Sequence, residues 1–234
     1  MVLLDQSFRC DNVAPSQMDE LWSFGWRHFG EYFFRYSLAT HNGHVCRVIP
    51  LRIDLNKFSP SRSQKRVLSK NRDVKIIVRD TLLDELKADL FYRHRNRFSN
   101  NIPDSIYDFL AVDAATVPCM NREICVYSGE RLIATSFLDI GFASTSAVYA
   151  MFDPVESKRS LGILTMLEAI RYTRELNCSY YYPGYAYVGS SSYEYKKNFS
   201  GLEFLDWEKG WRHYTKEEEL NYIDDYFDAE VTSI

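Results

Sequence analysis

The chain has 234 residues, of which 46% are hydrophobic and 26% charged, so it can bury a substantial core, and disordered and fibrous classes are excluded. The formal net charge of −4 excludes a protein that coats nucleic acid with its whole surface, so any nucleic-acid site must be local. No apolar run reaches the roughly 20 residues of a membrane span, no basic secretion signal opens the chain, and five scattered cysteines form no even disulfide framework, so we expect a cytoplasmic protein with reduced thiols.

The first predicted element is a long amphipathic helix. It begins near Ser16, and its aromatic residues recur at spacings of four and three up to Tyr36. The members of this stripe are Trp22, Trp26, Phe29, Phe33 and Tyr36. We expect the stripe to form core rather than a base-stacking surface, since apolar faces of helices are usually buried.

The following elements alternate between strands and helices. In chain order, the pattern predicts a strand at 76–78, a helix at 82–92, a strand at 108–114, a hairpin of 123–127 and 131–137 around Gly129, a strand at 146–152, a helix around 163–170 with a left-handed stop at Asn177, and a strand at 178–182. The acidic segment 203–234 is predicted to be a solvated surface helix. Three strands, a helix and a further strand in one module predict a mixed sheet with helices packed on it.

Charge is concentrated in one segment. Residues 52–75 contain eight basic and two acidic residues, so this segment carries +6 and the rest of the chain −10. Within it, Pro60 to Arg66 combine the cations Arg62, Lys65 and Arg66 with the hydroxyls of Ser61 and Ser63. Such a mixture suits nucleic-acid phosphates, because cations release counterions and hydroxyls fix the register. A solvated basic loop is the alternative.

Two later segments could also bind parts of a nucleotide. Asp153 to Gly162 lie where a strand gives way to a helix, so Arg159 and the Gly162 amide could hold a phosphate; ordinary helix capping is the alternative. Tyr180 to Lys197 contain seven tyrosines, which suit a pocket for an unpaired nucleotide and a peptide end. A strand packed on both faces would use tyrosine as well.

One group of residues could bind a metal. Cys10, His41, His44 and Cys46 together offer two thiolates and two imidazoles, but they lack the usual paired C-x-x-C spacing. We therefore expect no cofactor, with a metal at these four residues as the weaker alternative.

Taken together, several stretches resemble the arginyl-tRNA protein transferase family, including its bacterial leucyl-transferring branch. The matching stretches are Gly25–Gly30, Pro50–Arg52, Phe58–Arg66 with Asn71 and Asp73, Tyr107–Leu110, Val148–Tyr149, Phe152–Pro154, Arg159–Gly162, Tyr181–Tyr182, Gly184–Tyr185 and Tyr195–Lys196. The chain departs from the family where its amino-terminal cysteine cluster would lie, since Asn42, Val45 and Val48 stand there, and it has Ser190, Ser192 and Tyr193 where the family often has Cys, Lys and Met.

The resemblance implies an α/β fold like that of the GNAT acetyltransferases, with two fused halves and a mixed central sheet. We expect an amino-terminal half at 1–80 with the basic tRNA-binding segment, and a catalytic half at 81–234. The implied activity is that of an aminoacyltransferase of the N-degron pathway, which moves an amino acid from charged tRNA to the α-amino group of proteins that begin with Asp or Glu. We expect arginine as the donor amino acid, and leucine next, because tyrosines suit a cation.

The roles that follow can be assigned residue by residue. Arg159 and Gly162 would bind the terminal tRNA phosphate; Tyr182, Tyr185 and Tyr195 the terminal adenosine and aminoacyl group; Ser61, Ser63, Lys65, Arg66 and Lys196 the acceptor-stem phosphates; and Arg52 and Arg62 the acidic side chain of the acceptor. Asp153 is a candidate base, with a structural role beside Pro154 as the alternative. The expected partners are charged tRNA and a protein amino terminus, with no membrane, and we expect a monomer. The rival functions are a coenzyme A-dependent N-acyltransferase and a non-enzymatic RNA-binding module.

Overall fold

A mixed sheet forms the centre of the protein. The computed structural model describes residues 3–41, 43–98, 102–189, 193–220 and 222. The sheet has the order β12-β11-β5-β10-β9-β8-β7-β6, with β4 paired to β5 beside this path. Its strands are β4 (Leu38–His41), β5 (His44–Asp54), β6 (Lys75–Asp80), β7 (Asn121–Ser128), β8 (Arg131–Ile140), β9 (Ser144–Phe152), β10 (Tyr180–Tyr187), β11 (Leu202–Asp206) and β12 (Gly210–His213). Among the strands of the described residues, only β9 and β10 pair in parallel, so the expected mixed α/β fold is confirmed.

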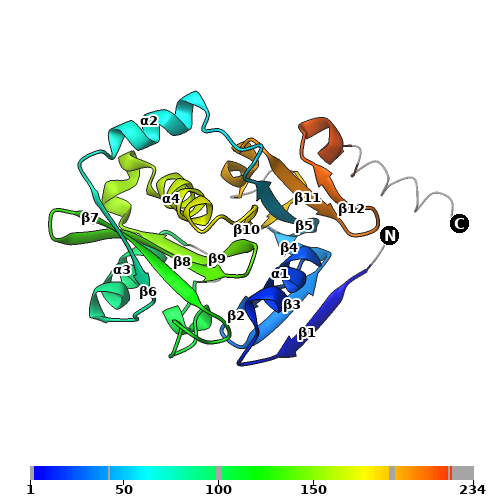
Figure 1. Cartoon of the computed structure of the whole chain (residues 1–234), viewed down its shortest axis with the longest axis horizontal. Helices are drawn as coiled ribbons and strands as arrows, with labels where there is room; N and C mark the ends of the chain where they lie inside the picture. The colour runs from blue at the N-terminus through cyan, green and yellow to red at the C-terminus, as the bar shows by residue number, and fades with distance from the viewer. Residues whose placement is uncertain (1–2, 42, 99–101, 190–192, 221, 223–234) are drawn as a thin grey trace, which may run out of the picture.

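Helices cover both faces of this sheet (Figure 1). Helices α2 (Arg62–Lys70) and α4 (Leu161–Glu175) lie on one face, and α3 (Glu85–Arg95) lies on the other. Successive side chains of β7 point to opposite faces of the sheet. Val126 packs with Leu161 of α4 on one face, whereas Cys125 packs with Phe91 of α3 on the other. Each face therefore has its own apolar core.

A second, smaller sheet lies at the amino-terminal end, with the order β1-β3-β2. Its strands are β1 (Asp5–Arg9), β2 (Arg27–Phe29) and β3 (Tyr32–Tyr36), and α1 (Pro15–Ser23) precedes β2. The long helix predicted from residue 16 to 36 is therefore wrong beyond Ser23. Gly25 and Gly30 have φ angles of +79° and +51°, which turn the chain into β2 and then β3. Trp22 and Phe33 still share one buried cluster, so these two members of the aromatic stripe are core as expected.

Most later elements are confirmed. The strand at 76–78 is part of β6, the 82–92 helix corresponds to α3, the hairpin around Gly129 joins β7 to β8, and the remaining strands and helix are β9, α4 and β10. Asn177 has a φ angle of +57°, as predicted for a left-handed stop. Pro183 and Gly184 do not end β10, because the strand continues to Tyr187 through a shift in register.

Two predicted elements are wrong. Residues 108–114 form no strand: Asp108 closes the short helix η1 (Ile106–Asp108), and its carboxylate accepts hydrogen bonds from two backbone N–H groups. The acidic tail is not one helix either, because residues 202–213 form β11 and β12, with Phe204 buried. Residues 216–220 are helical, whereas 221 and 223–234 lie outside the described residues.

The central sheet crosses the expected boundary at residue 80. Strand β5 precedes the boundary but lies between β10 and β11, which both follow it. The division at 1–80 and 81–234 stays a prediction. Among the described residues, no helix combines the length and apolar character that a membrane crossing requires.

Candidate active site

The central sheet opens where its two parallel strands separate. Strands β9 and β10 pair only from Ser144 opposite Tyr180 to Ser146 opposite Tyr182. Beyond this point β9 continues to pair with β8, whereas β10 shifts register between Tyr181 and Gly184 and pairs with β5. Backbone groups and side chains at the separation point therefore face each other without a shared ladder of hydrogen bonds.

Arg27 of β2 reaches this separation point. Its guanidinium donates to Ser146 Oγ and to the carbonyl of Ala147 on β9. On the other side, a side chain added to Gly184 of β10 would have its Cβ 3.8 Å from Arg27 Nη2 and 3.4 Å from Lys196 Nζ, so the glycine leaves these cations room. Among the described residues, no carboxylate forms an ion pair with Arg27. Burial lowers the pKa of Arg27, but a guanidinium remains charged at neutral pH.

Tyrosines surround the guanidinium. Tyr36 of β3 and Tyr185 of β10 have ring centroids 5.4 Å apart, and Tyr185 donates its hydroxyl hydrogen to the carbonyl of Gly25 over 2.6 Å. Burial raises the pKa of Tyr36 to about 12, and it raises the pKa values of Tyr181 and Tyr185 further. These phenols therefore stay neutral at physiological pH and cannot balance the charge of Arg27.

Lys196 supplies a second cationic side chain. It lies on the short helix η3 (Glu194–Asn198), and its Nζ donates to the carbonyl of Tyr185 over 3.1 Å and lies 4.7 Å from the ring centroid of Tyr193. Burial, and then the charge of Arg27, lower the pKa of Lys196 to about 7. The site thus holds one fixed cation and one amine of which about half is neutral at pH 7.

The exposed basic face of α2 adjoins η3. Arg62, Lys65 and Arg66 are exposed, at positions that helical spacing places on one face. The Gln64 side chain donates to the carbonyl of Asn198 over 3.1 Å, so the beginning of α2 contacts the end of η3. Ser61 is the N-cap of α2, and its hydroxyl lies 2.9 Å from that of Ser63. The predicted phosphate-binding residues therefore form one surface next to the helix that carries Lys196.

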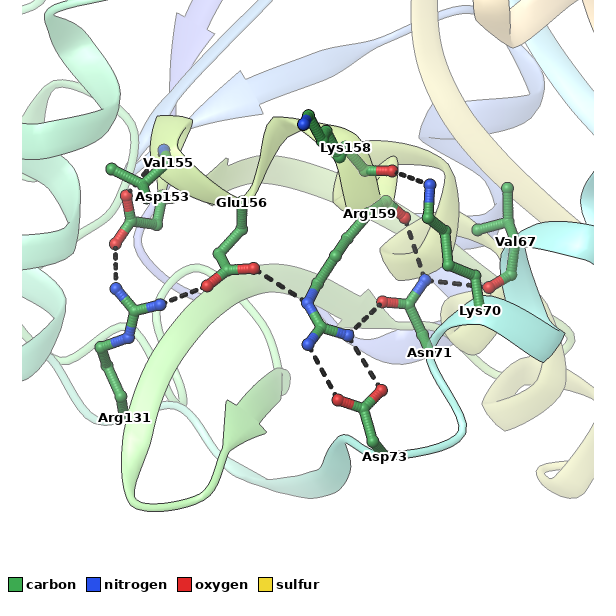
Figure 2. A network of polar contacts seen from close by, with 10 residues as sticks. All are labelled: Val67, Lys70, Asn71, Asp73, Arg131, Asp153, Val155, Glu156, Lys158 and Arg159. Atoms are coloured by element: carbon green, nitrogen blue, oxygen red, sulfur yellow. Dashed lines mark hydrogen bonds and ion pairs between the residues drawn. The ribbon is translucent and has the colours of Figure 1, made fainter.

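Arg159 is engaged by the protein itself (Figure 2). Its guanidinium donates to both carboxylate oxygens of Asp73 over 2.9 and 2.8 Å, and its Nε donates to Glu156 over 2.9 Å. Asn71, at the end of α2, donates to the carbonyl of Arg159 over 2.9 Å. This network ties α2 to the segment before α4, so the geometry favours a structural role for Arg159 over the predicted phosphate contact. Gly162, in the first turn of α4, is partly exposed.

Asp153 is buried at one end of the same network, and its carboxylate oxygens are engaged by partners within the protein. Its carboxylate is 2.8 Å from Arg93 Nη1 and 3.1 Å from Arg131 Nη1, and it also accepts from the Val155 N–H at the start of η2 (Pro154–Arg159). These partners come from α3, from the start of β8 and from η2, so the carboxylate joins three elements of the fold. The alternative structural role beside Pro154 fits this geometry.

Arg52 and Tyr182 are also committed to internal contacts. The Arg52 guanidinium lies between the rings of Tyr180 and Trp211, at 4.2 and 4.3 Å, and donates to Glu203 over 2.7 Å. Tyr182 is 5% exposed and packs against the rings of Trp22 and Trp211. Neither residue is placed to contact the Arg27 group. Tyr195, by contrast, is 38% exposed beside Lys196.

The four residues considered for a metal do not converge. Among the described residues, no three of Cys10, His41, His44 and Cys46 bring their donor atoms together. The thiol of Cys10 donates to the carbonyl of Asn12 over 3.4 Å. The residues present therefore do not fit the metal or iron–sulfur group that the resembled family carries near its amino terminus.

A different, buried trio of donor atoms does converge: His28, Cys119 and Asp139. His28 Nδ1 donates to the carbonyl of Gly30 over 2.9 Å, which leaves Nε2 at 2.7 Å from Asp139 Oδ2. Tetrahedral zinc would hold such a nitrogen and oxygen about 3.4 Å apart, so the observed distance fits a shared proton instead. The trio links the small sheet to the central sheet.

One hollow of the surface is not lined by Arg27. Its volume is about 500 Å³, and it lies between the β2–β3 turn and the segment that follows η1. Glu31, Asp108 and Asp113 contribute acidic side chains, against one cation, Arg9. Like-charge repulsion makes this hollow a poor site for nucleic-acid phosphates.

Sequence reasoning missed Arg27 because the residue fell within the predicted long helix. The sequence signal that could have identified it is the position of Arg27 between Gly25 and Gly30, because two glycines this close together favour turns over a continuous helix. Lys196 was identified, but as a phosphate ligand.

Comparison with known proteins gives matches along the chain. The family model "Arginine-tRNA-protein transferase, N terminus" matches residues 4–66, and "Arginine-tRNA-protein transferase, C terminus" matches residues 86–206. A protein of Acinetobacter baumannii named aspartate/glutamate leucyltransferase is 30% identical over 233 residues, covering 95% of this chain and 82% of that protein. A protein of Helicobacter hepaticus with the same name is 28% identical over 207 residues, 85% of this chain and 83% of that one. The crystal structure of FemX aligns with a TM-score of 0.48 at 12% identity, covering 80% of this chain and 67% of that one.

Proposed function

The chain belongs to the arginine-tRNA-protein transferase family and is an aminoacyl-tRNA protein transferase, and we propose that it transfers leucine to proteins that begin with Asp or Glu, at the separation point of β9 and β10. The observation that carries the proposal is that Arg27 forms no ion pair among the described residues, although the charge of Asp139 acts on it from a distance. A guanidinium without a carboxylate partner in a partly buried site binds an anionic group favourably. The acidic side chain of the acceptor supplies such a group.

Arg27 replaces Arg52 as our candidate for acceptor recognition. Arg52 already has a carboxylate partner in Glu203, so binding a second carboxylate would require the first to leave. Arg62 is exposed on α2 and stays a second candidate, but exposed ion pairs contribute little to binding.

The donor side favours leucine over arginine. Arg27 and Lys196 place positive charge in the site, and Lys196 already lies over the ring of Tyr193. An arginyl side chain would meet like charges there, which costs binding energy, whereas a leucyl side chain would not. The relatives named above are leucyltransferases, in agreement with this choice. The cation-binding tyrosines that suggested arginine are thus used by the protein's own cations.

The exposed cations of α2 would hold the tRNA. Arg62, Lys65 and Arg66 would contact acceptor-stem phosphates, and the contact between Gln64 and Asn198 would keep that surface at a fixed distance from Lys196. Tyr185 and Tyr195 would lie near the terminal adenosine. One chain supplies these residues, so a monomer suffices, and we expect it to act in the cytoplasm, where tRNA is charged.

Little further chemistry is needed. The aminoacyl ester is already activated, so holding the acceptor amine close to the ester carbonyl supplies much of the rate. The protein's residues would bind the two substrates, fix the acidic side chain at Arg27 and exclude alternative acceptors.

The test combines each donor with each acceptor. The purified chain is incubated with tRNA charged with leucine or with arginine, and with peptides that begin with Asp, Glu, Asn or Ala, and products are weighed by mass spectrometry. We expect one leucyl addition to the Asp and Glu peptides. Exclusive arginine addition would refute the donor choice, and equal transfer to the Ala peptide would refute the acceptor choice. No transfer from any charged tRNA, or micromolar binding of acetyl-CoA, would refute the function.

A further inference from the structure

We propose that Lys196 accepts the proton that the acceptor's α-ammonium must lose before it attacks the aminoacyl ester, an inference that rests on the proposed function. Its Nζ lies beside the β10 register shift, 3.1 Å from the carbonyl oxygen of Tyr185. A neutral amine can donate to this carbonyl and still keep its lone pair for a proton. A residue in this position can therefore serve as a base without losing its anchoring bond.

The contrast with the next lysine shows what sets Lys196 apart. Lys197 is buried, and its Nζ lies 2.7 Å from a carboxylate oxygen of Glu194 and 2.6 Å from one of Glu219. Lys197 therefore has a carboxylate partner on each of two segments. Among the described residues, Lys196 has no such ion pair, and its neighbour Arg27 disfavours a second positive charge. Two adjacent lysines thus have opposite environments, one suited to structure and one to proton transfer.

The other groups around Lys196 do not titrate near neutrality. Arg27 of β2 stays charged, and the remaining ionisable neighbours are phenols: Tyr36 of β3, Tyr181 and Tyr185 of β10, and Tyr193 and Tyr195 beside or within η3. Burial raises the pKa of each of these phenols above its usual value. Burial and the charge of Arg27 lower the pKa of Lys196 to about 7. Of the groups named, Lys196 is the one that changes charge between pH 6 and 9.

The proton balance of the step is simple. The α-amino group of the acceptor arrives as an ammonium, which the positive charge of the site repels. This ammonium gives one proton to Lys196 Nζ. The freed amine lone pair forms the new C–N bond at the ester carbonyl, and the bond from that carbon to the ribose oxygen breaks. The nitrogen loses its second proton as the ribose oxygen gains one. Lys196 then releases its proton to water, so each turnover releases one proton.

The experiment measures kcat/KM for an Asp-started peptide against pH, with saturating leucyl-tRNA. For the natural chain we expect a profile that rises as Lys196 becomes neutral near pH 7 and then levels off, because the free peptide amine that forms above about pH 8 also attacks the ester. K196M should lower kcat/KM about 5- to 10-fold at pH 7 and move the rise of the profile to about pH 8, because only the peptide that is already a free amine then reacts. K216M, at an exposed lysine outside the site, should keep the natural profile.

The arginine variant separates a base from a mere cation. K196R keeps a positive charge but cannot accept a proton, so we expect it to lose as much activity as K196M. Activity of K196R at pH 7 within about 2-fold of the natural chain, or a K196M profile that still rises near pH 7, would overturn the inference. Thermal melting of each variant checks that it folds. Absence of transfer by the natural chain would instead overturn the proposed function, so the two failures are distinguishable.

Discussion

Removal of the Arg27 charge should abolish the preference for acidic acceptors. Arg27 uses two of its five N–H donors on Ser146 and Ala147, so a fork remains to bind a carboxylate. Hydrogen bonds to a charged group contribute about 1.5–3 kcal/mol, so we expect a coupling of about 2–3 kcal/mol between Arg27 and the acidic side chain. This corresponds to a change of about 30- to 150-fold in selectivity.

The assay is a double-mutant cycle. Values of kcat/KM are measured for the natural chain and R27M, each with a peptide that begins with Asp and with one that begins with Asn. The cycle cancels any general damage from the lost contacts to β9, since both peptides experience it. R52M is the matched comparison: its guanidinium is paired with Glu203, so we expect lower stability and no coupling. Coupling below about 0.5 kcal/mol at Arg27, or strong coupling at Arg52, would refute the assignment.

Three further perturbations test the surrounding structure. In the natural chain we expect log tRNA affinity to fall with log salt at a slope between about −3 and −5. Lys65→Ala should make this slope shallower by about one, and an unchanged slope would show that α2 lies outside the interface. Arg159→Ala should destabilise the fold only slightly at pH 7 in urea unfolding, because the pair with Asp73 is largely exposed to solvent. Arg159 lowers the pKa of Asp73 in the folded state, so the ion pair stabilises the fold above the unfolded pKa of about 4 and loses this effect as the pH falls through the folded pKa. The stability of the variant should therefore fall less steeply in acid than that of the natural chain. Equal acid sensitivity would argue against the ion pair. His28→Leu removes the partner of Asp139 Oδ2 and leaves the Asn121 amide on Oδ1; it should cost about 1–3 kcal/mol in chemical denaturation, and a loss under about 0.5 kcal/mol would contradict its structural role.

Local pattern determined the elements whose signals lie close together in sequence. Gly129 between two β-rich stretches specifies a hairpin, and apolar residues at 163, 166, 167 and 170 specify α4, because turn geometry and helical period act over a few residues. The same rule failed from Trp26 to Tyr36. Spacings of three and four are compatible with a helix, but two positive-φ glycines and pairing with β1 override that tendency.

Composition and motifs also determined the family and the basic surface, since cations at 62, 65 and 66 fall on one helical face without tertiary information. Only the tertiary structure decided which of the cationic side chains are placed to bind a substrate. Arg52 and Arg159 each form an ion pair with a carboxylate from a distant segment, Glu203 and Asp73 respectively. Arg27 forms none among the described residues, although the charge of Asp139 acts on it from a distance. Ion pairing and desolvation depend on groups far apart in sequence, and therefore the charge of Arg27 and the pKa of Lys196 are set only when β2, β10 and η3 come together.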